Sequence, residues 1–287
     1  MELGREGVNL PCGVGLPLAL PASEGKALKI AVAGKGGSGK TVIAALMIRI
    51  ATEMATTRVL AIDADSAVSL PYALGIDFKD TVSEIRSRLI EDPHARAAAR
   101  DKPIRDLMAA ATQPGQGVVL LVMGRPEGPG CYCGINDMLR YGIDSLTSEY
   151  GVIVIDCEAG PEQMNRRVVN GVDVLAILTD VSLRGVRVAR SIMKVVENDP
   201  TMVQTQIGLV INRSRDNHRT VVDEAAEWEL DVLGIVPEDQ LVAEYDGVGR
   251  PIIELPSTSP SVHGVRAIMN NIRSAHPQSF APTILSR

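Results

Sequence analysis

Residues 34–41 read Gly-Lys-Gly-Gly-Ser-Gly-Lys-Thr, between the apolar run Ile30–Ala33 and a second apolar run that begins at Val42. This order predicts a strand, a glycine-rich loop and a helix. The loop fits the pattern G-x-x-x-x-G-K-[ST], in which backbone N–H groups wrap a phosphate, the lysine contacts the β- and γ-phosphates and the hydroxyl binds Mg²⁺. The N-terminus of the helix adds positive potential at the same place. The sequence therefore predicts a nucleotide phosphate site formed by Gly34, Lys35, Gly36, Gly37, Ser38, Gly39, Lys40 and Thr41.

Length and composition favour one large α/β domain. The chain has 287 residues, of which 45% are hydrophobic and only 3% are aromatic, so it can bury an extensive aliphatic core. We expect a poorly ordered N-terminal tail at residues 1–26, a single domain at 27–275 and a C-terminal tail at 276–287. The formal net charge of −6 and the absence of a basic run disfavour nucleic acid as a partner. No apolar stretch is long enough to span a membrane, so we expect a cytoplasmic protein with no membrane partner.

Apolar strand patterns alternate with helical patterns along the chain, which predicts a mainly parallel sheet of seven or eight strands with helices on both faces. The predicted strands are Leu28–Ala33, Val59–Asp63, Val118–Met123, Val152–Asp156, Val172–Leu178, Ile207–Ile211 and Val232–Val236. The predicted helices are Lys40–Ala55, Thr81–Arg88, Asn136–Glu149, Gly185–Glu197, Thr220–Trp228 and Ser261–Ser274.

Two of these strands end in aspartate. The second predicted strand runs into Asp63-Ala64-Asp65, and the fourth ends at Asp156. Ligands of such sheets lie beyond the carboxyl ends of the strands, and Mg²⁺ is usually held by few carboxylates together with phosphate and water. Beside a phosphate loop, this pattern favours a magnesium site over two ordinary solvated strand ends.

Lys35 occupies a loop position at which the general pattern makes no demand. With it, the run GKGGSGKT resembles the deviant Walker A motif of the P-loop NTPase group that contains the nitrogenase iron protein, the Min and Par positioning ATPases and metal-insertion ATPases. This resemblance implies that Lys35 reaches the nucleotide of the other subunit in a homodimer. A cation supplied in trans stabilises charge on the transferred phosphoryl group, so ATP hydrolysis becomes conditional on dimerisation.

The same resemblance assigns roles to the strand ends. The segment at Asp63–Asp65 corresponds to switch I, whose aspartates position the attacking water and bind Mg²⁺ through water, and Asp65 is the favoured residue. Asp156 corresponds to the Walker B aspartate, and Gly160 to the glycine of switch II. The implied catalytic residues are Lys35, Lys40 and Asp65, and the implied magnesium residues are Thr41, Asp65 and Asp156, some of them through water. Ser66 stands where this switch commonly has proline.

Base selection is expected after the sixth predicted strand. Asn212-Arg213 resembles the adenine-recognition motif of this group, and an amide side chain offers the donor and acceptor that the N6 and N7 edge of adenine requires. Pro237-Glu238 resembles the loop that packs beside the base. The alternative is that Asn212 only caps a turn.

Cys131 and Cys133 form a second distinctive element, in a glycine-rich loop after the third predicted strand. Two thiols so close in sequence can bind one soft metal. Zn²⁺ or an iron–sulfur cluster usually takes four ligands, and a twofold dimer would supply each thiol twice. An incidental or redox-sensing pair is the alternative, whereas Cys157 is expected to be a buried packing residue.

The C-x-C pair, the D-x-E-A-G segment at residues 156–160 and the deviant P-loop together resemble the CooC family of nickel-insertion ATPases, over residues 27–275. That resemblance implies an ATP-dependent homodimer with bound Mg²⁺ that holds Ni²⁺ or Zn²⁺ at the shared cysteines and delivers nickel to a client such as carbon monoxide dehydrogenase. Two alternatives stay open. One is an electron donor like the nitrogenase iron protein, with a shared [4Fe–4S] cluster, and the other is a Min/Par-type positioning ATPase.

Overall fold

The computed structural model describes residues 27–54, 58–99, 104–125, 141, 144–146, 149–160, 171–197, 199 and 202–280. The predicted N-terminal tail, most of the predicted helix Asn136–Glu149 and the pair Cys131 and Cys133 lie outside these ranges. Towards the C-terminus, the 3-10 helix η5 (Pro277–Phe280) follows the last α-helix, and Phe280 is buried in the core.

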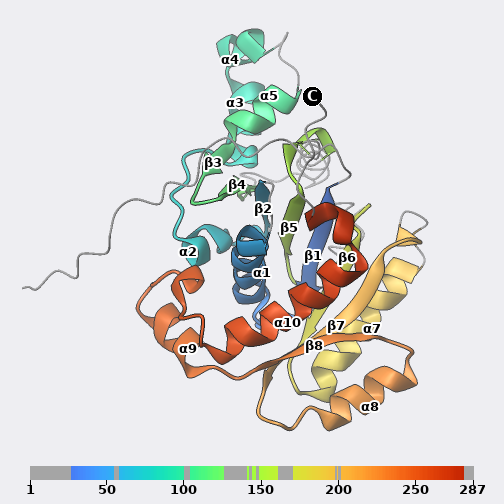
Figure 1. The fold of residues 1–287 in the computed structure, drawn as a ribbon. Coiled ribbons are helices and arrows are strands. Elements are labelled where there is room, and N and C mark those ends of the chain that lie inside the picture. The colour runs from blue at the N-terminus through green and yellow to red at the C-terminus, as the bar shows by residue number, and fades with distance from the viewer. Residues whose placement is uncertain are drawn as a thin grey trace, which may run out of the picture.

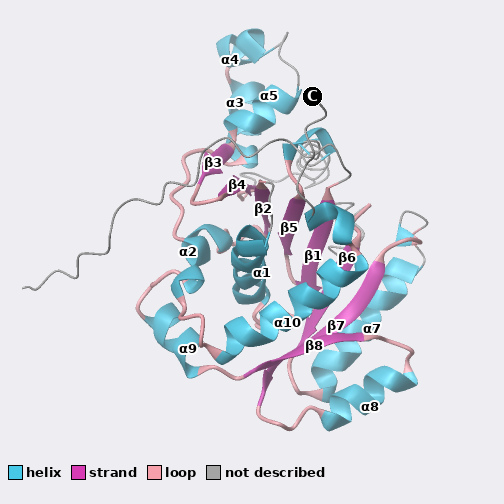
Figure 2. Ribbon diagram, in the orientation of Figure 1, coloured by secondary structure: helices cyan, strands magenta, loops and turns pink. Residues whose placement is uncertain are grey.

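Eight strands form one sheet in the order β3-β4-β2-β5-β1-β6-β7-β8 (Figures 1 and 2). All pairs are parallel except β3 with β4. The predicted parallel α/β sheet is confirmed, and the seven predicted strands match observed ones. The strands are β1 (Leu28–Gly34), β2 (Val59–Ala64), β3 (Thr112–Pro114), β4 (Val118–Val122), β5 (Val152–Cys157), β6 (Val174–Thr179), β7 (Gln206–Ser214) and β8 (Val232–Pro237).

Helices cover both faces of the sheet, as expected. One core lies between the sheet and α1, α2, α9, η4 and α10, and the other lies between the sheet and α3, α5, α7 and α8. The α-helices are α1 (Lys40–Met54), α2 (Leu70–Leu74), α3 (Val82–Glu91), α4 (Pro93–Ala99), α5 (Ile104–Ala110), α7 (Leu183–Glu197), α8 (Arg219–Glu227), α9 (Gln240–Gly247) and α10 (Pro260–Ala275), and η4 is the 3-10 helix Ile252–Glu254. Among them, none is long and apolar enough to cross a membrane.

Alternation along β1 shows how the sequence divides between the two cores. Leu28, Ile30 and Val32 belong to the core under α1 and α10, whereas Ala31 and Ala33 belong to the core under α7. Side chains of a strand point alternately to opposite faces, so a strand buried on both faces is apolar throughout. This explains the continuous apolar runs from which the strands were predicted.

The strand β1 lies between β5 and β6, and its carboxyl end leads directly into the glycine-rich loop. A Cβ atom at Gly34 would lie 2.4 Å from the carbonyl oxygen of Leu178 on β6. Only glycine allows the two strands to stay this close as the loop begins. Since parallel strands end at the same edge of the sheet, the residues that follow β1, β2, β5 and β6 gather around that loop.

Candidate functional site

The loop from Gly34 to Thr41 connects β1 to α1 as predicted. Three of its glycines have positive φ angles, 147° at Gly34, 75° at Gly37 and 92° at Gly39. At Gly39, a Cβ atom would also lie 2.5 Å from the amide nitrogen of Asn212. Conformation therefore favours glycine at all three positions, and lack of space also requires it at Gly34 and Gly39. Lys40 is the first residue of α1 and is largely buried.

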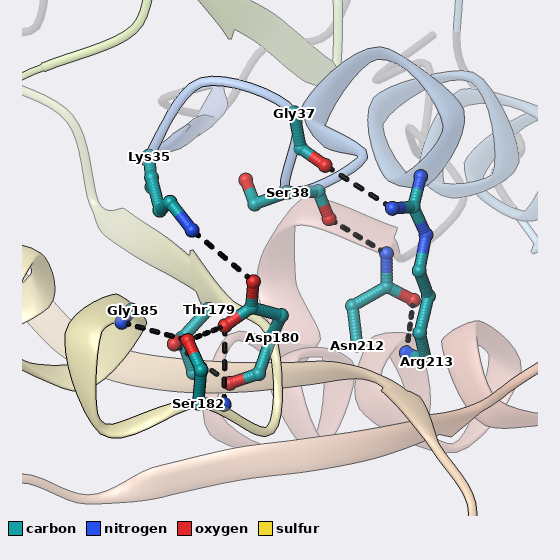
Figure 3. Close-up of polar contacts among 9 residues, drawn as sticks. All are labelled: Lys35, Gly37, Ser38, Thr179, Asp180, Ser182, Gly185, Asn212 and Arg213. Carbon is teal, nitrogen blue, oxygen red and sulfur yellow. Dashed lines mark hydrogen bonds and ion pairs between the residues drawn. The ribbon is translucent and has the colours of Figure 1, made fainter.

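Asn212 and Arg213, from the end of β7, hold the loop from outside (Figure 3). The Asn212 amide donates to the carbonyl of Ser38 at 2.8 Å, and its oxygen accepts from the backbone N–H of Arg213 at 2.9 Å. The Arg213 guanidinium donates to the carbonyl of Gly37 at 3.2 Å. The structure thus gives both side chains a loop-supporting contact that the sequence analysis missed. Their predicted contact with adenine stays a prediction.

Pro237 ends β8 beside this segment, and Glu238 follows it. The backbone N–H of Glu238 donates to the carbonyl of Ser214 at 2.9 Å, which fixes the loop against the end of β7. The Glu238 carboxylate pairs with the Arg215 guanidinium, and one N–O contact measures 2.6 Å. The predicted base-side loop therefore lies next to Asn212 and Arg213, at the end of the neighbouring strand.

Thr41 and Asp156 meet at the carboxyl edge of the sheet. The Thr41 hydroxyl donates to Asp156 Oδ2 at 2.7 Å and lies 3.0 Å from the hydroxyl of Ser69. Asp156 is fully buried, and its Oδ1 has no hydrogen-bond partner within the described part of the chain. Burial raises the pKa of Asp156 to about 7, although the bond from Thr41 and the charge of Lys40 act in the opposite direction.

This pair fits a magnesium ion. It offers a hydroxyl and a carboxylate, which are hard oxygen ligands, and a buried oxygen that lacks a partner. Across the described ranges, no group of three or more His, Cys, Asp and Glu side chains could hold a metal ion. Such a sparse set of protein ligands suits Mg²⁺, which is commonly bound through one or two carboxylates plus phosphates and water.

Asp63 has a structural role that the sequence analysis missed. It pairs in register with Asp156 across β2 and β5 and is fully buried. Its carboxylate accepts from the backbone N–H groups of Asp65 and Leu70, both at 3.0 Å, and so fixes the loop between β2 and α2. Burial and the nearby Asp156 raise the pKa of Asp63 to about 7.

Asp65, the favoured switch residue, lies on that loop and is half-buried. Its carboxylate accepts from the backbone N–H of Ala67 at 2.9 Å. Its charge contributes to the raised pKa of Asp156, so it lies near the predicted magnesium site. Ser66 donates its hydroxyl to Glu158 Oε1 at 3.1 Å, which links the loop after β2 to the loop after β5. The residue that replaces the common proline therefore connects the two predicted switch segments.

The loop after β5 also contacts the phosphate loop. The N–H of Gly160 donates to the carbonyl of Gly34 at 3.3 Å. Cys157 is buried, its thiol lies 3.8 Å from the carbonyl of Ile155, and burial raises its pKa. A thiol with a raised pKa is a poor thiolate ligand, so Cys157 is a packing residue as expected. Cys131 and Cys133 lie outside the described residues.

Lys35 points away from the helix and toward the end of β6 (Figure 3). Its Nζ lies 3.3 Å from Oδ2 of Asp180, the residue that follows that strand. Asp180 carries no sequence signal of this contact, because an aspartate after a strand is also an ordinary solvated end.

A glycine loop between a central strand and a helix, with a threonine hydroxyl bonded to a buried aspartate beside it, defines a P-loop nucleotide-binding protein. A family model agrees with this class. The model described as "CobQ/CobB/MinD/ParA nucleotide binding domain" matches residues 29–252, and the chain belongs to this family.

Comparison with individual proteins places the chain among related ATPases. It is 37% identical to an uncharacterized ATP-binding protein of Methanocaldococcus jannaschii, over 85% of this chain and 97% of that protein. It is 26% identical to the carbon monoxide dehydrogenase accessory protein CooC of Rhodospirillum rubrum, over 84% of this chain and 96% of CooC. The septum site-determining protein MinD of Pyrococcus horikoshii, solved with Mg-ADP, has the same fold, with a TM-score of 0.62 at 22% identity over 88% of this chain and 98% of MinD.

The raised pKa of Asp156 predicts how Asp156→Asn changes stability. A carboxyl whose pKa is near 7 when folded and near 4 when unfolded binds more protons in the folded state, so its contribution to the free energy of unfolding falls as pH rises between those values. Asparagine carries no charge to bury. In EDTA without nucleotide, we expect the free energy of unfolding of the variant to exceed that of wild type by about 1–3 kcal/mol at pH 8 and to differ little from it at pH 5. Urea unfolding measures this quantity.

Asp223→Asn, at an exposed position of α8, is the matched control and should leave stability within about 0.5 kcal/mol of wild type at both pH values. A variant Asp156→Asn that is less stable than wild type at pH 8 would contradict the assigned burial cost.

Proposed function

We propose that this chain binds Mg·ATP in the loop Gly34–Thr41 and hydrolyses it as a homodimer. One observation carries the proposal: the Thr41 hydroxyl lies 2.7 Å from Asp156 beside the phosphate loop, and the second oxygen of Asp156 is buried without a partner among the described residues. A buried carboxylate costs free energy unless a cation or a hydrogen bond compensates it. A bound Mg²⁺ would provide that compensation and would neutralise charge on the phosphates.

Each residue of the site has a separate role in this proposal. The backbone N–H groups of the loop and Lys40 bind the β- and γ-phosphates, and Thr41 and Asp156 hold the metal. Asp65 orients the attacking water from the loop after β2. Asp63 does not contact the nucleotide in this proposal but fixes that loop through Asp65 and Leu70. Lys35 acts on the nucleotide of the partner.

Lys35→Ala is expected to separate binding from hydrolysis. Nucleotide affinity should stay within about threefold of wild type, because the loop and Lys40 are intact, whereas ATP turnover should fall by about 100-fold or more, because the trans cation is lost. Titration with a fluorescent ATP analogue and a phosphate-release assay measure the two quantities. Lys40→Ala, which should weaken binding itself, is the comparison, and wild-type turnover by Lys35→Ala would refute the role of Lys35.

We assign adenine selection to Asn212, Arg213, Pro237 and Glu238. In support, the ends of β7 and β8 lie side by side, and Asn212 already contacts the phosphate loop. The amide uses one donor toward Ser38 and accepts one bond from Arg213, which leaves a second N–H and a second acceptor position for a base.

The variant Asn212→Ala distinguishes base selection from loop support. If the amide reads adenine, the preference for ATP over GTP should fall by about tenfold. If it only supports the loop, both nucleotides should weaken equally. Calorimetric titration with each nucleotide decides between the two outcomes, and an unchanged ATP-to-GTP ratio would contradict the assignment.

We further propose that the dimer is a cytoplasmic metallochaperone whose cargo is Ni²⁺, with Zn²⁺ able to occupy the same thiols. The pair Cys131 and Cys133 and the 26% identity to a carbon monoxide dehydrogenase accessory protein support this function. Two copies would provide four thiolates, a complete set for one soft metal. ATP binding would favour the closed dimer that holds the metal, and hydrolysis would release it to a client metalloenzyme such as carbon monoxide dehydrogenase.

The double variant Cys131→Ala/Cys133→Ala should lose stoichiometric Ni²⁺ and Zn²⁺ binding while its ATP affinity stays at the wild-type value. Metal analysis after anaerobic dialysis, with and without ATP, measures the first quantity, and nucleotide titration measures the second. Cys157→Ala is the control, because Cys157 is buried and should not contribute. Undiminished metal binding by the double variant would contradict the assignment of Ni²⁺ as cargo at these cysteines. A brown wild-type protein with cluster absorption would favour the [4Fe–4S] alternative.

A further inference from the structure

The ion pair between Lys35 and Asp180 joins the loop after β1 to the end of β6 in the same chain (Figure 3). The proposed function requires Lys35 to reach the nucleotide bound by a second copy. In the single chain, the Lys35 side chain is therefore held by Asp180 of its own subunit and not by the partner's nucleotide.

Hydrogen bonds orient the Asp180 carboxylate. Its Oδ1 accepts from the backbone N–H of Ser182 at 3.1 Å and also from the Ser182 hydroxyl. The Ser182 oxygen in turn accepts from the backbone N–H of Gly185 at 3.1 Å, in the first turn of α7. With Oδ1 occupied in this way, Oδ2 faces Lys35.

Gly185 makes room for this arrangement. A Cβ atom there would lie 2.6 Å from Asp180 Oδ1 and 2.3 Å from the hydroxyl oxygen of Thr179. Glycine inside a helix costs stability relative to alanine. The first turn of α7 therefore gives up some helix stability and leaves space for the Asp180 carboxylate in its observed orientation.

Asp180 is charged at neutral pH, yet its contact with Lys35 can open. Partial burial acts to raise its pKa, but the hydrogen bonds from Ser182 and Lys35 hold the pKa below its ordinary value. The N-terminus of α7 also favours a negative charge at this place. The two side chains are 31% and 33% exposed, and ion pairs with this degree of exposure are weak.

We propose that Asp180 keeps Lys35 in an ion pair within its own chain. Lys35 leaves this pair only when the phosphates of a nucleotide on a second copy of this chain compete for the ammonium group. The inference rests on the proposed ATP-dependent homodimer and concerns its regulation. A triphosphate is a stronger partner for an ammonium group than one carboxylate, so the exchange is favourable when ATP is present on the partner. Each dimer opens two such pairs, and the contact therefore raises the protein concentration at which the dimer forms.

Asp180→Asn tests this inference, because asparagine can still accept the bonds from Ser182 but lacks the charge. The measurement is sedimentation velocity across a protein concentration series with the non-hydrolysable analogue AMPPNP and Mg²⁺. An exposed ion pair changes an equilibrium by up to about fivefold, and two pairs open per dimer, so the dimer dissociation constant should fall by about 2- to 25-fold. In the Lys35→Ala background, the same substitution should have no effect.

Three outcomes separate the inference from the function on which it rests. If wild type dimerises with the analogue and Asp180→Asn dimerises equally or more weakly, the proposed restraint of Lys35 by Asp180 is overturned while the homodimer stands. If wild type stays monomeric with the analogue, both are overturned. Asp223→Asn removes the same charge on α8 and should not change the dissociation constant. If it lowers the constant as much as Asp180→Asn does, net charge explains the effect and the inference fails.

Discussion

The arrangement of this site depends on the parallel pairing of β1 with β5 on one side and β6 on the other. That pairing places Gly34 opposite Leu178 with no room for a side chain, so the residue at which the loop begins must be glycine. Because the strands run in the same direction, Asp156 and Asp180 emerge at the same edge as the loop. One constraint of backbone packing thus brings the phosphate loop, the proposed metal ligands and the partner of Lys35 together.

Two buried carboxylates then give the site its chemistry. Asp63 and Asp156 lie in register on adjacent strands, both fully buried, and the pKa of each is raised to about 7. Two backbone N–H groups satisfy Asp63, whereas the described part of the chain offers no partner to one oxygen of Asp156. The difference gives Asp63 a role in loop support and supports the proposed role of Asp156 as a cation ligand. A buried group without a partner destabilises the free protein. Because the ligand removes that cost, the site binds its ligand more tightly and the ligand stabilises the fold.

The sequence was sufficient for the parallel sheet and the phosphate loop, since long apolar runs and a glycine motif depend on local residues alone. It did not predict β3, which has three residues on the sheet edge and includes Pro114, or the short helices α2, α4, α5 and α9. Nor did it predict the roles of Asp63 and Asp180, or the contacts of Asn212 and Arg213 with the loop. Those roles depend on contacts between residues distant in sequence, which a local pattern does not encode.

The proposed hydrolysis of ATP requires two chains together. Measurement of ATP turnover per chain against protein concentration, from the nanomolar to the micromolar range at saturating Mg·ATP, tests this requirement. If Lys35 acts across a dimer, turnover per chain rises with concentration and reaches a plateau once the dimer dominates. A measurable turnover per chain that stays constant over the whole range, with the protein monomeric throughout, would contradict the account.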